Sequence, residues 1–474
     1  QIIPGTPITR DITGEEVYST IYALRESTLE PGVIWSGAND GPVFVTRDNG
    51  KTWKNVTPKD LPPGGRVQNI EPSPHRKGSA YIAVYRYLLN DWQPYIYVTN
   101  DYGATWKRLT DGNNGIPADF PTRVVREDPD REGLLYAGTE FGMYISFDNG
   151  AHWQSFQLNL PVTPVTDIRV HRKDLVLSTM GRAFWIMDNV TPLHQLNAGV
   201  QKSEAHLYEP RPAYRMKYRP MPARPDSPEF PAPGAQIDFY LASKPQSELK
   251  FEILDAKGVV IQTISSSAGR GGGNQPEAAA PIDPDAGFRM MPAQRLAVDT
   301  GMNRFNWNMR LPGAWNRSTQ RPDSNGPLVA PGRYTVRISA DGWSKTQPLV
   351  IKADPRLIKD GVTQADLEEQ FAVNIRLRET SSKASKIVAR IDEALKTPTG
   401  RDNDKSLREI RARLVTASGP YPQPMLIDQL NGISRMINDA DRKVGRSAIA
   451  YLDALEKQLA EIQVAVNLKI GSNQ

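Results

Sequence analysis

The sequence predicts a mainly β protein with an α-helical tail, in which β-propeller blades are followed by a small β-sandwich and a short helical bundle. Three observations support this fold class. A short turn motif recurs at the spacing of propeller blades, alternating strands continue beyond residue 236, and the apolar period then changes from two to 3.6 residues. The expected parts are blades in 1–202, a proline-rich connector in 203–235, the sandwich in 236–356 and helices in 357–474.

The repeated motif reads Ser/Thr-x-Asp-x-Gly-x-x-Trp and occurs three times. Its aspartates lie 53 and then 47 residues apart, which predicts one four-stranded blade per repeat. In a hairpin, Asp accepts backbone hydrogen bonds, Gly supplies a positive φ, and Trp packs the turn onto the blade. We therefore expect a structural role for Asp48, Gly50, Trp53, Asp101, Gly103, Trp106, Asp148, Gly150 and Trp153.

This motif resembles the Asp-box, or bacterial neuraminidase repeat, of sialidase-like and sortilin-like β-propellers. In the sandwich, the segments Gly-x-Asn-x-Phe-x-Trp (301–307) and Pro-Gly-x-Tyr-x-Val (331–336) resemble the immunoglobulin-like module of flagellar hook-capping proteins. Together the parts are similar to the C-terminal region of large exported bacterial proteins that are often labelled glycosyl hydrolase. The resemblance implies a secreted or periplasmic propeller scaffold that binds protein, peptide or glycan partners.

Composition narrows the function classes. The 474 residues contain no cysteine, which excludes disulfides, thiol nucleophiles and cysteine metal sites. The five histidines show no metal-binding spacing, and a single Asp-box carboxylate cannot hold calcium, so no cofactor or metal is predicted. A net charge of +5 without basic runs predicts no nucleic-acid partner. No apolar run is long enough to predict a membrane span.

About four blades fit into residues 16–215, and the fourth Asp-box has decayed to Asp188-Asn189. An open arc of four blades would leave the apolar faces of its end blades bare. Because the chain also begins at Gln1 and not at Met, we expect further blades to complete the ring. They would come from an upstream propeller segment of the same protein or from a partner chain.

The later parts have their own signals. Eight prolines between 210 and 233 predict an extended connector, and residues 265–295 predict a low-complexity loop. Thr363 with Asp366 predicts the capped start of the first tail helix. Breaks at Pro398, Gly400 and Gly419-Pro420 leave apolar stripes too short for a coiled coil, so we expect the tail to dock on the rest of the molecule.

The most site-like feature is the long loop of the second blade, residues 86–95, whose counterpart in the third blade is only 140–142. Extra length with aromatic and polar side chains suits a sugar or a peptide, although the same aromatics could simply pin the loop to its blade. Arg182 in the fourth blade could face the propeller axis or form a structural ion pair. The candidate binding residues are Tyr87, Asn90, Asp91, Trp92 and Arg182.

No catalytic residue is predicted. Sialidases need an arginine triad for the substrate carboxylate, and this sequence has no Arg-Ile-Pro-type segment. Arg123, Arg126 and Arg169 lie on the expected inner strands, where they are solvated or ion-paired. A binding or assembly module is therefore favoured, and the alternative is a glycoside hydrolase with its site on the axis. Two carboxylates about 5 Å or 7–9 Å apart in an axial pocket with aromatic walls would favour the enzyme.

Overall fold

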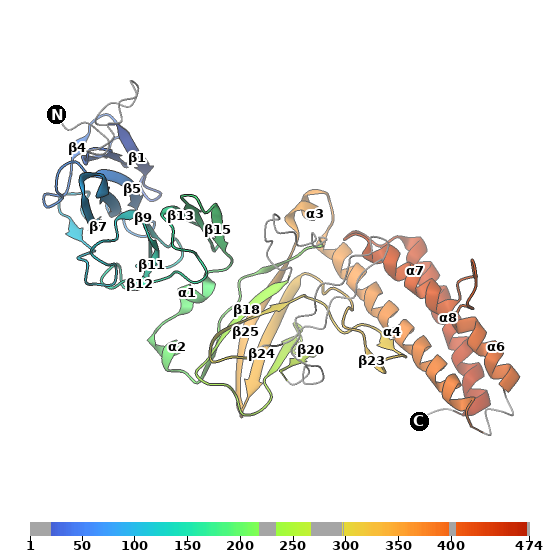
Figure 1. Ribbon diagram of the computed structural model, residues 1–474. Coiled ribbons are helices and arrows are strands. Elements are labelled where there is room, and N and C mark those ends of the chain that lie inside the picture. The colour runs from blue at the N-terminus through green and yellow to red at the C-terminus, as the bar shows by residue number, and fades with distance from the viewer. Residues whose placement is uncertain (1–19, 218–233, 267–295, 297, 398–403, 472–474) are drawn as a thin grey trace. The chain divides into compact units, whose positions relative to one another are not determined.

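The computed structural model describes residues 20–217, 234–266, 296, 298–397 and 404–471. The chain divides into two compact units, residues 1–195 and 196–474. The first contains successive small sheets, and the second contains a β-sandwich and a group of helices (Figure 1). The predicted fold class, mainly β with blades, a sandwich and a helical tail, is confirmed. Among the described residues, no helix is both long and apolar enough to cross a membrane.

The first unit is built from four antiparallel sheets, each a meander in chain order, which we call blades 1 to 4. The strands are β1 Ile21–Glu26, β2 Ile34–Ala38, β3 Val43–Thr46 and β4 Lys54–Asn55 in blade 1; β5 Arg66–Pro72, β6 Ala80–Arg86, β7 Asp91–Thr99 and β8 Lys107–Arg108 in blade 2; β9 Thr122–Glu127, β10 Leu135–Thr139, β11 Gly142–Ser146 and β12 Gln154–Ser155 in blade 3; and β13 Val165–His171, β14 Asp174–Thr179 and β15 Phe184–Met187 in blade 4.

All four blades carry the same β-bulge between their first two strands. One residue of the first strand has no partner in each blade, and these residues are Tyr22, Gln68, Arg123 and Thr166. A bulge increases local twist and redirects the side chain of the extra residue. Because the bulges coincide, they align the blades residue by residue: Leu24, Ile70, Val125 and Ile168 are equivalent and pair with Ser36, Ile82, Ala137 and Leu177.

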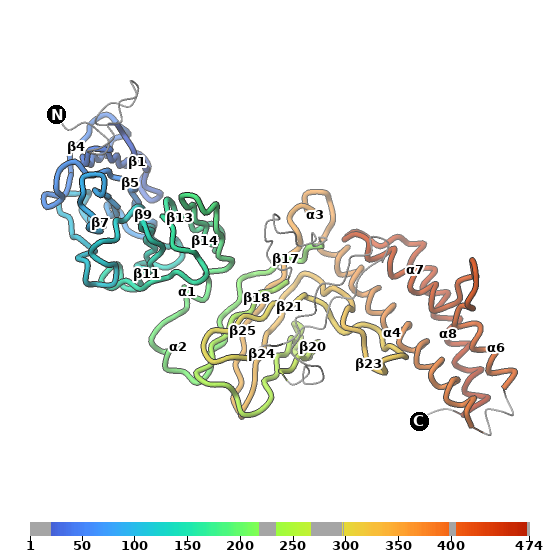
Figure 2. The backbone as a smooth tube through the Cα atoms, in the orientation of Figure 1, coloured from blue at the N-terminus to red at the C-terminus, as the bar shows by residue number. Residues whose placement is uncertain are grey.

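The core of the first unit lies between the blades. Three apolar clusters each join one face of a blade to the facing side of the next, from blade 1 through blade 4. Trp35, for example, is buried in the cluster that blade 1 shares with Val67 and Ile70 of blade 2. The inner strands are neighbours in the order β1, β5, β9, β13, as the backbone trace shows (Figure 2). Blades 2 and 3 are therefore each covered on both faces by a neighbouring blade.

The second unit contains two sheets around one apolar core. The smaller sheet has the order β16 Ala205–Leu207, β18 Ala235–Leu241 and β21 Gly301–Trp307. The larger sheet has the order β17 Ala213–Arg215, β25 Trp343–Ala353, β24 Gly332–Ala340, β19 Lys250–Leu254 and β20 Val260–Ser265, and a hairpin joins β22 Trp315–Asn316 to β23 Arg321–Pro322. The immunoglobulin-like assignment of this sandwich stays a prediction.

The predicted connector differs from the structure where it is described. Two short segments within 203–217 are β16 and β17, each at the edge of a sandwich sheet. Pro210 and Pro212 lie in the segment between these two strands. They remove no hydrogen bond of either sheet, because proline lacks only the N–H that a residue inside a strand would donate. The rest of the connector, 218–233, and nearly all of the predicted loop, 267–295, lie outside the described residues, as do Pro398 and Gly400.

The helices are α1 Thr191–Gln195 in the first unit, and α2 Ala198–Lys202, α3 Pro355–Lys359, α4 Gln364–Ala394, α6 Asp404–Leu414, α7 Leu426–Asn438 and α8 Arg446–Ile470 in the second. The predicted capping box of Thr363 and Asp366 starts α4. Docking of the tail is confirmed within the second unit. Arg215 of β17 is buried and donates to the side chains of Gln370 at 2.7 Å and Asp441 at 3.0 Å, and Phe371 packs on the sandwich core.

Candidate functional site

The meander of each blade places its loops at two edges. Since neighbouring strands are antiparallel, the loops after the first and third strands share one edge, and the loops after the second strand and between blades share the other. We call the first the Asp-box edge, because the predicted motifs connect the third and fourth strands there. We call the second the pocket edge; its loops include residues 39–42, 62–65, 87–90, 140–141, 156–164 and 180–183.

A pocket of about 370 Å³ opens at the pocket edge between blades 2, 3 and 4. Three loops contribute, and most of the lining side chains are apolar or aromatic. Of the described residues that line it, Glu140 is the one that is charged. The lining residues are Tyr87, Trp92, Glu140, Phe141, Val162, Thr163 and Pro164. The volume lies within the usual range for small-ligand sites.

Stacked aromatic rings form one wall of the pocket. The ring of Tyr87 stacks on Tyr85, with centroids 4.9 Å apart, and lies 5.8 Å from the ring of Trp92. On the other side, Phe141 packs on Phe120 with centroids 4.6 Å apart. Trp92 and Phe141 nevertheless stay exposed. Aromatic side chains held in this way offer contact area at little cost in conformational entropy.

Arg123 holds Tyr87 and Glu140 of the pocket in place through polar contacts. It is the bulge residue of blade 3, and its Nε donates to Glu140 at 2.6 Å while Nη2 donates to the Tyr87 hydroxyl at 3.1 Å. Its guanidinium also lies over the rings of Tyr85 and Tyr87. Burial alone would lower the pKa of Arg123, but the partner Glu140 raises it above the usual value. Arg123 therefore remains a cation and neutralises the carboxylate of the pocket.

The structure brings only some of the predicted binding residues together. Tyr87 and Trp92 line the pocket, whereas Asn90 closes the short 3-10 turn Tyr87–Leu89 with a positive φ of 61°. Asp91 accepts hydrogen bonds from Arg86 at 2.7 Å and Tyr95 at 2.8 Å, which makes it a support of the loop. Arg182 is exposed on the same edge in blade 4 but does not line the pocket. Ligand binding by Tyr87 and Trp92 stays a prediction.

Sequence reasoning missed five lining residues. Glu140 and Phe141 form a loop of two residues, and 162–164 belong to a connection between blades, so neither has unusual length. The signal available in the sequence was the presence of two apolar residues, Phe141 and Val162, in connections between strands.

The Asp-box edge repeats one hydrogen-bond network three times. The hydroxyl of Thr46, Thr99 or Ser146 donates to the motif aspartate at 2.8–2.9 Å and accepts from the motif glycine at 2.9 Å. The same aspartate accepts from the backbone N–H four residues later, at 2.8–2.9 Å. The motif glycines have φ between 81° and 87°. These contacts occupy one oxygen of each aspartate, and the hydroxyl of Thr52 or Thr105 or the ring of His152 contacts the other.

The motif tryptophans differ between blades. The indole N–H of Trp106 donates to the Val56 carbonyl of blade 1 at 2.6 Å, and that of Trp153 to the Leu109 carbonyl of blade 2 at 3.1 Å. Trp53 in blade 1 has no described blade before it and is exposed. Where a preceding blade is present, the tryptophan therefore joins two blades as well as packing its own turn.

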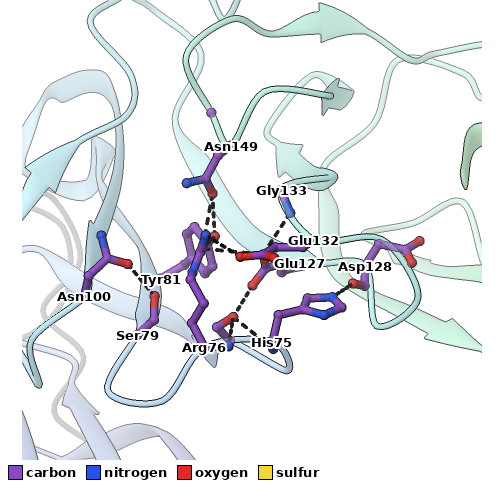
Figure 3. Close-up of polar contacts among 12 residues, drawn as sticks. His75, Arg76, Ser79, Tyr81, Asn100, Glu127, Asp128, Glu132, Gly133 and Asn149 are labelled. Atoms are coloured by element: carbon purple, nitrogen blue, oxygen red, sulfur yellow. Dashed lines mark hydrogen bonds and ion pairs between the residues drawn. The ribbon is translucent and has the colours of Figure 1, made fainter. Parts of the chain in front are cut away.

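A buried carboxylate ties blades 2 and 3 together at this edge. Glu127 accepts from the Ser73 hydroxyl at 2.5 Å and from the Gly133 N–H at 3.0 Å, and pairs with Arg76 at 3.5 Å. Figure 3 shows Arg76 between Glu127, Tyr81 and Asn149. Each contact is between groups of the protein itself, so we interpret this cluster as a structural link between blades 2 and 3.

Among the described residues, one carboxylate cluster resembles a metal site by spacing alone. Asp128, Asp130 and His194 bring ligand atoms within 4.8 Å of one another. However, the Asp128 oxygens accept from the Tyr136 hydroxyl, from His194 Nε2 and from the backbone of Asp130. These contacts anchor α1 on blade 3, so the cluster has an evident structural role.

Two carboxylates on the inner strands share one arginine. Arg126 contacts Glu71 at 2.5 Å and Asp167 at 2.6 Å, one with each terminal nitrogen. Burial raises the pKa of Glu71, and Arg126 opposes that rise. The sequence left open whether the inner-strand arginines are solvated or ion-paired, and the structure answers this for each of them. Arg123 and Arg126 are ion-paired, whereas Arg169 is exposed.

Comparisons with known proteins add a fold likeness only. No family model and no curated protein matches the sequence. The chain is similar to a GH74 xyloglucanase from Xanthomonas campestris, with 16% identity over 38% of this chain and 29% of that chain, at a TM-score of 0.30. It is also similar to YCF48 bound to D1 peptide (18%, 40% and 54%, TM-score 0.28) and to YCF48 from Cyanidioschyzon merolae (16%, 36% and 54%, TM-score 0.27).

The chain therefore spans about a third to a half of these structures, and likeness at this level carries no functional argument. The class rests on the chain's own geometry. Four successive meander sheets, packed face to face around neighbouring inner strands, are blades of a β-propeller type.

Proposed function

We propose that the first unit is a binding scaffold that takes an apolar side chain of a protein or peptide partner into the pocket formed by Tyr87, Trp92 and Phe141. The observation that carries the proposal is the lining itself: exposed aromatic rings on a preorganised wall, with the charge of Glu140 already neutralised by Arg123. Apolar pockets with rigid aromatic anchors are typical binding hot spots. An exported location forms part of the proposal and rests on the family resemblance.

A glycan fits this lining less well. A sugar ring needs many hydrogen bonds besides aromatic stacking, and the described lining offers few polar side chains, of which two already have partners in the protein. Glu140 accepts from Arg123, and the Thr163 hydroxyl donates to the Met180 carbonyl at 3.2 Å. Glycoside hydrolysis at this pocket is also disfavoured, because one carboxylate is found among the described residues that line it and the reaction needs two.

The test uses the whole chain with two arrays of probes, one of short unstructured peptides carrying Leu, Pro or Trp anchors and one of neutral oligosaccharides. We expect peptide binding that falls at least about tenfold, roughly 1.4 kcal/mol, in Trp92→Ala and in Phe141→Ala. Tyr421→Ala, which removes a fully exposed aromatic ring from the second unit, is the control and should bind normally. Trp92-dependent binding of oligosaccharides without peptide binding would contradict the proposal and favour the glycan alternative.

A further inference from the structure

Blades 1 and 4 each have one face that no described blade covers. The strand pairings identify the side chains on these faces, because residues alternate between faces and the bulges align the blades. The first end face, on blade 1, carries Leu24, Ser36 and Phe44. The last end face, on blade 4, carries Val176, Phe184, Ile186 and Arg169.

The first end face carries the kind of side chain that the other blades bury under a preceding blade. Leu24 is equivalent to Ile70, Val125 and Ile168, which are each 0% exposed because the preceding blade packs on them. Leu24 is 55% exposed. The sequence therefore keeps a large aliphatic residue at a position that only a preceding blade would bury.

The last end face shows the same contrast in the third strand. Phe184 is equivalent to Val43, Ile96 and Met143, which are at most 1% exposed, yet Phe184 is 78% exposed. Ile186 is equivalent to Val45, Val98 and Ile145, which are at most 5% exposed, and it is 61% exposed. The intervening residues Trp185 and Met187 pack inward against blade 3. A strand with apolar side chains on both faces is typical of a sheet covered on both sides.

A polar contact between blades 3 and 4 has matching groups on the two end faces. Inside the unit, Nε of Arg126 donates to the Ile168 carbonyl of the next blade at 2.8 Å. Arg169 is equivalent to Arg126, since each directly follows the aligned residue of its inner strand, and Leu24 is equivalent to Ile168. A blade like blade 1, placed on the last end face, would thus offer Arg169 the carbonyl of Leu24. The last end face therefore fits the first end face in its apolar side chains and in this one hydrogen bond.

We propose that the last end face of one copy packs on the first end face of a second copy of this chain, head to tail. The contact would repeat the packing between blades 3 and 4. Two copies in this arrangement cover all four end faces, and four plus four blades give a ring within the usual range of propellers. Association would bury Leu24, Phe184 and Ile186, which are costly to expose together.

The test is the mass of the whole chain in solution by light scattering over a range of concentrations. We expect twice the monomer mass for the natural sequence. The single variant Leu24→Lys and the double variant Phe184→Lys with Ile186→Lys should each be monomeric, because each lacks one face. Mixed together, these two variants should form a one-to-one dimer, since each still has the face that the other needs. Leu468→Lys, at an exposed leucine of α8, should stay dimeric.

Far-UV circular dichroism checks that the variants are folded. If Leu24→Lys lowers the melting temperature, the milder Leu24→Ser replaces it. A monomer of natural sequence at every concentration would overturn self-association and leave the end faces for blades of another polypeptide. A dimer that persists in both face variants, or a mixture that stays monomeric, would also overturn the head-to-tail arrangement.

Discussion

The two edges of the blades contrast in how their polar groups are used. At the Asp-box edge, the same hydrogen bonds recur in three hairpins, and the carboxylates of Asp48, Asp101 and Asp148 are all engaged inside the turn. At the pocket edge, the loops differ in length and sequence from blade to blade and leave aromatic rings such as Trp92 exposed. A feature that repeats in every blade serves folding, whereas a feature confined to one edge of two blades is free to serve binding.

The largest expected effect tests whether the Asp-box edge is structural. Glu127→Ala removes the buried acceptor of Ser73, Gly133 and Arg76 and should lower the free energy of unfolding of the first unit by about 3 kcal/mol. Urea denaturation followed by tryptophan fluorescence measures it. If Glu127→Ala left stability unchanged and abolished peptide binding, the Asp-box edge would serve binding and not folding.

A smaller loss is expected from a single Asp-box. Asp101→Ala removes three hydrogen bonds, from Thr99 and from the backbone and hydroxyl of Thr105, and should cost about 1–2 kcal/mol of unfolding free energy. Asp119→Ala, at an exposed aspartate of the pocket edge, is the matched control and should change stability by less than about 0.5 kcal/mol. Equal effects of the two substitutions would show that the edges do not differ.

The pocket wall should matter less for stability than for binding. Trp92→Ala removes one exposed ring that packs at a tilt against Tyr87, and we expect a loss of no more than about 1 kcal/mol in unfolding free energy. The same denaturation experiment measures it beside the binding assay. A destabilisation larger than that of Asp101→Ala would support the other interpretation of the loop, in which Trp92 pins it to its blade.

The smallest effect concerns pH. Hydrogen bonds from Thr52 lower the pKa of Asp48 from 3.8 to about 2. Because the folded pKa is depressed, the contribution of Asp48 to stability is fully present above pH 3.8 and is lost as the pH falls through about 2. An NMR titration of the side-chain carboxyl should show this low midpoint, and Thr52→Val should move it back towards the ordinary value. A normal midpoint in the natural sequence would contradict the network.

The sequence by itself determined the parts that repeat or alternate. The Asp-box spacing located the hairpins between the third and fourth strands, because a turn with a local hydrogen-bond network and a glycine at positive φ depends on few residues outside it. The capping box at Thr363 was equally local. Strands β16 and β17 escaped notice because a three-residue edge strand has too little pattern to distinguish it from a connector.

Only the tertiary structure decided which loops meet. Tyr87 and Trp92 could be singled out from loop length, but Phe141 and Val162 became part of the same pocket only through the packing of blades 2, 3 and 4. The alternatives for Arg123 and Arg126 were settled in the same way, by partners that lie 17 to 55 residues away in the chain. Local propensity fixes turns and strand faces, whereas contacts between blades depend on register and twist accumulated over whole sheets, which no short segment encodes.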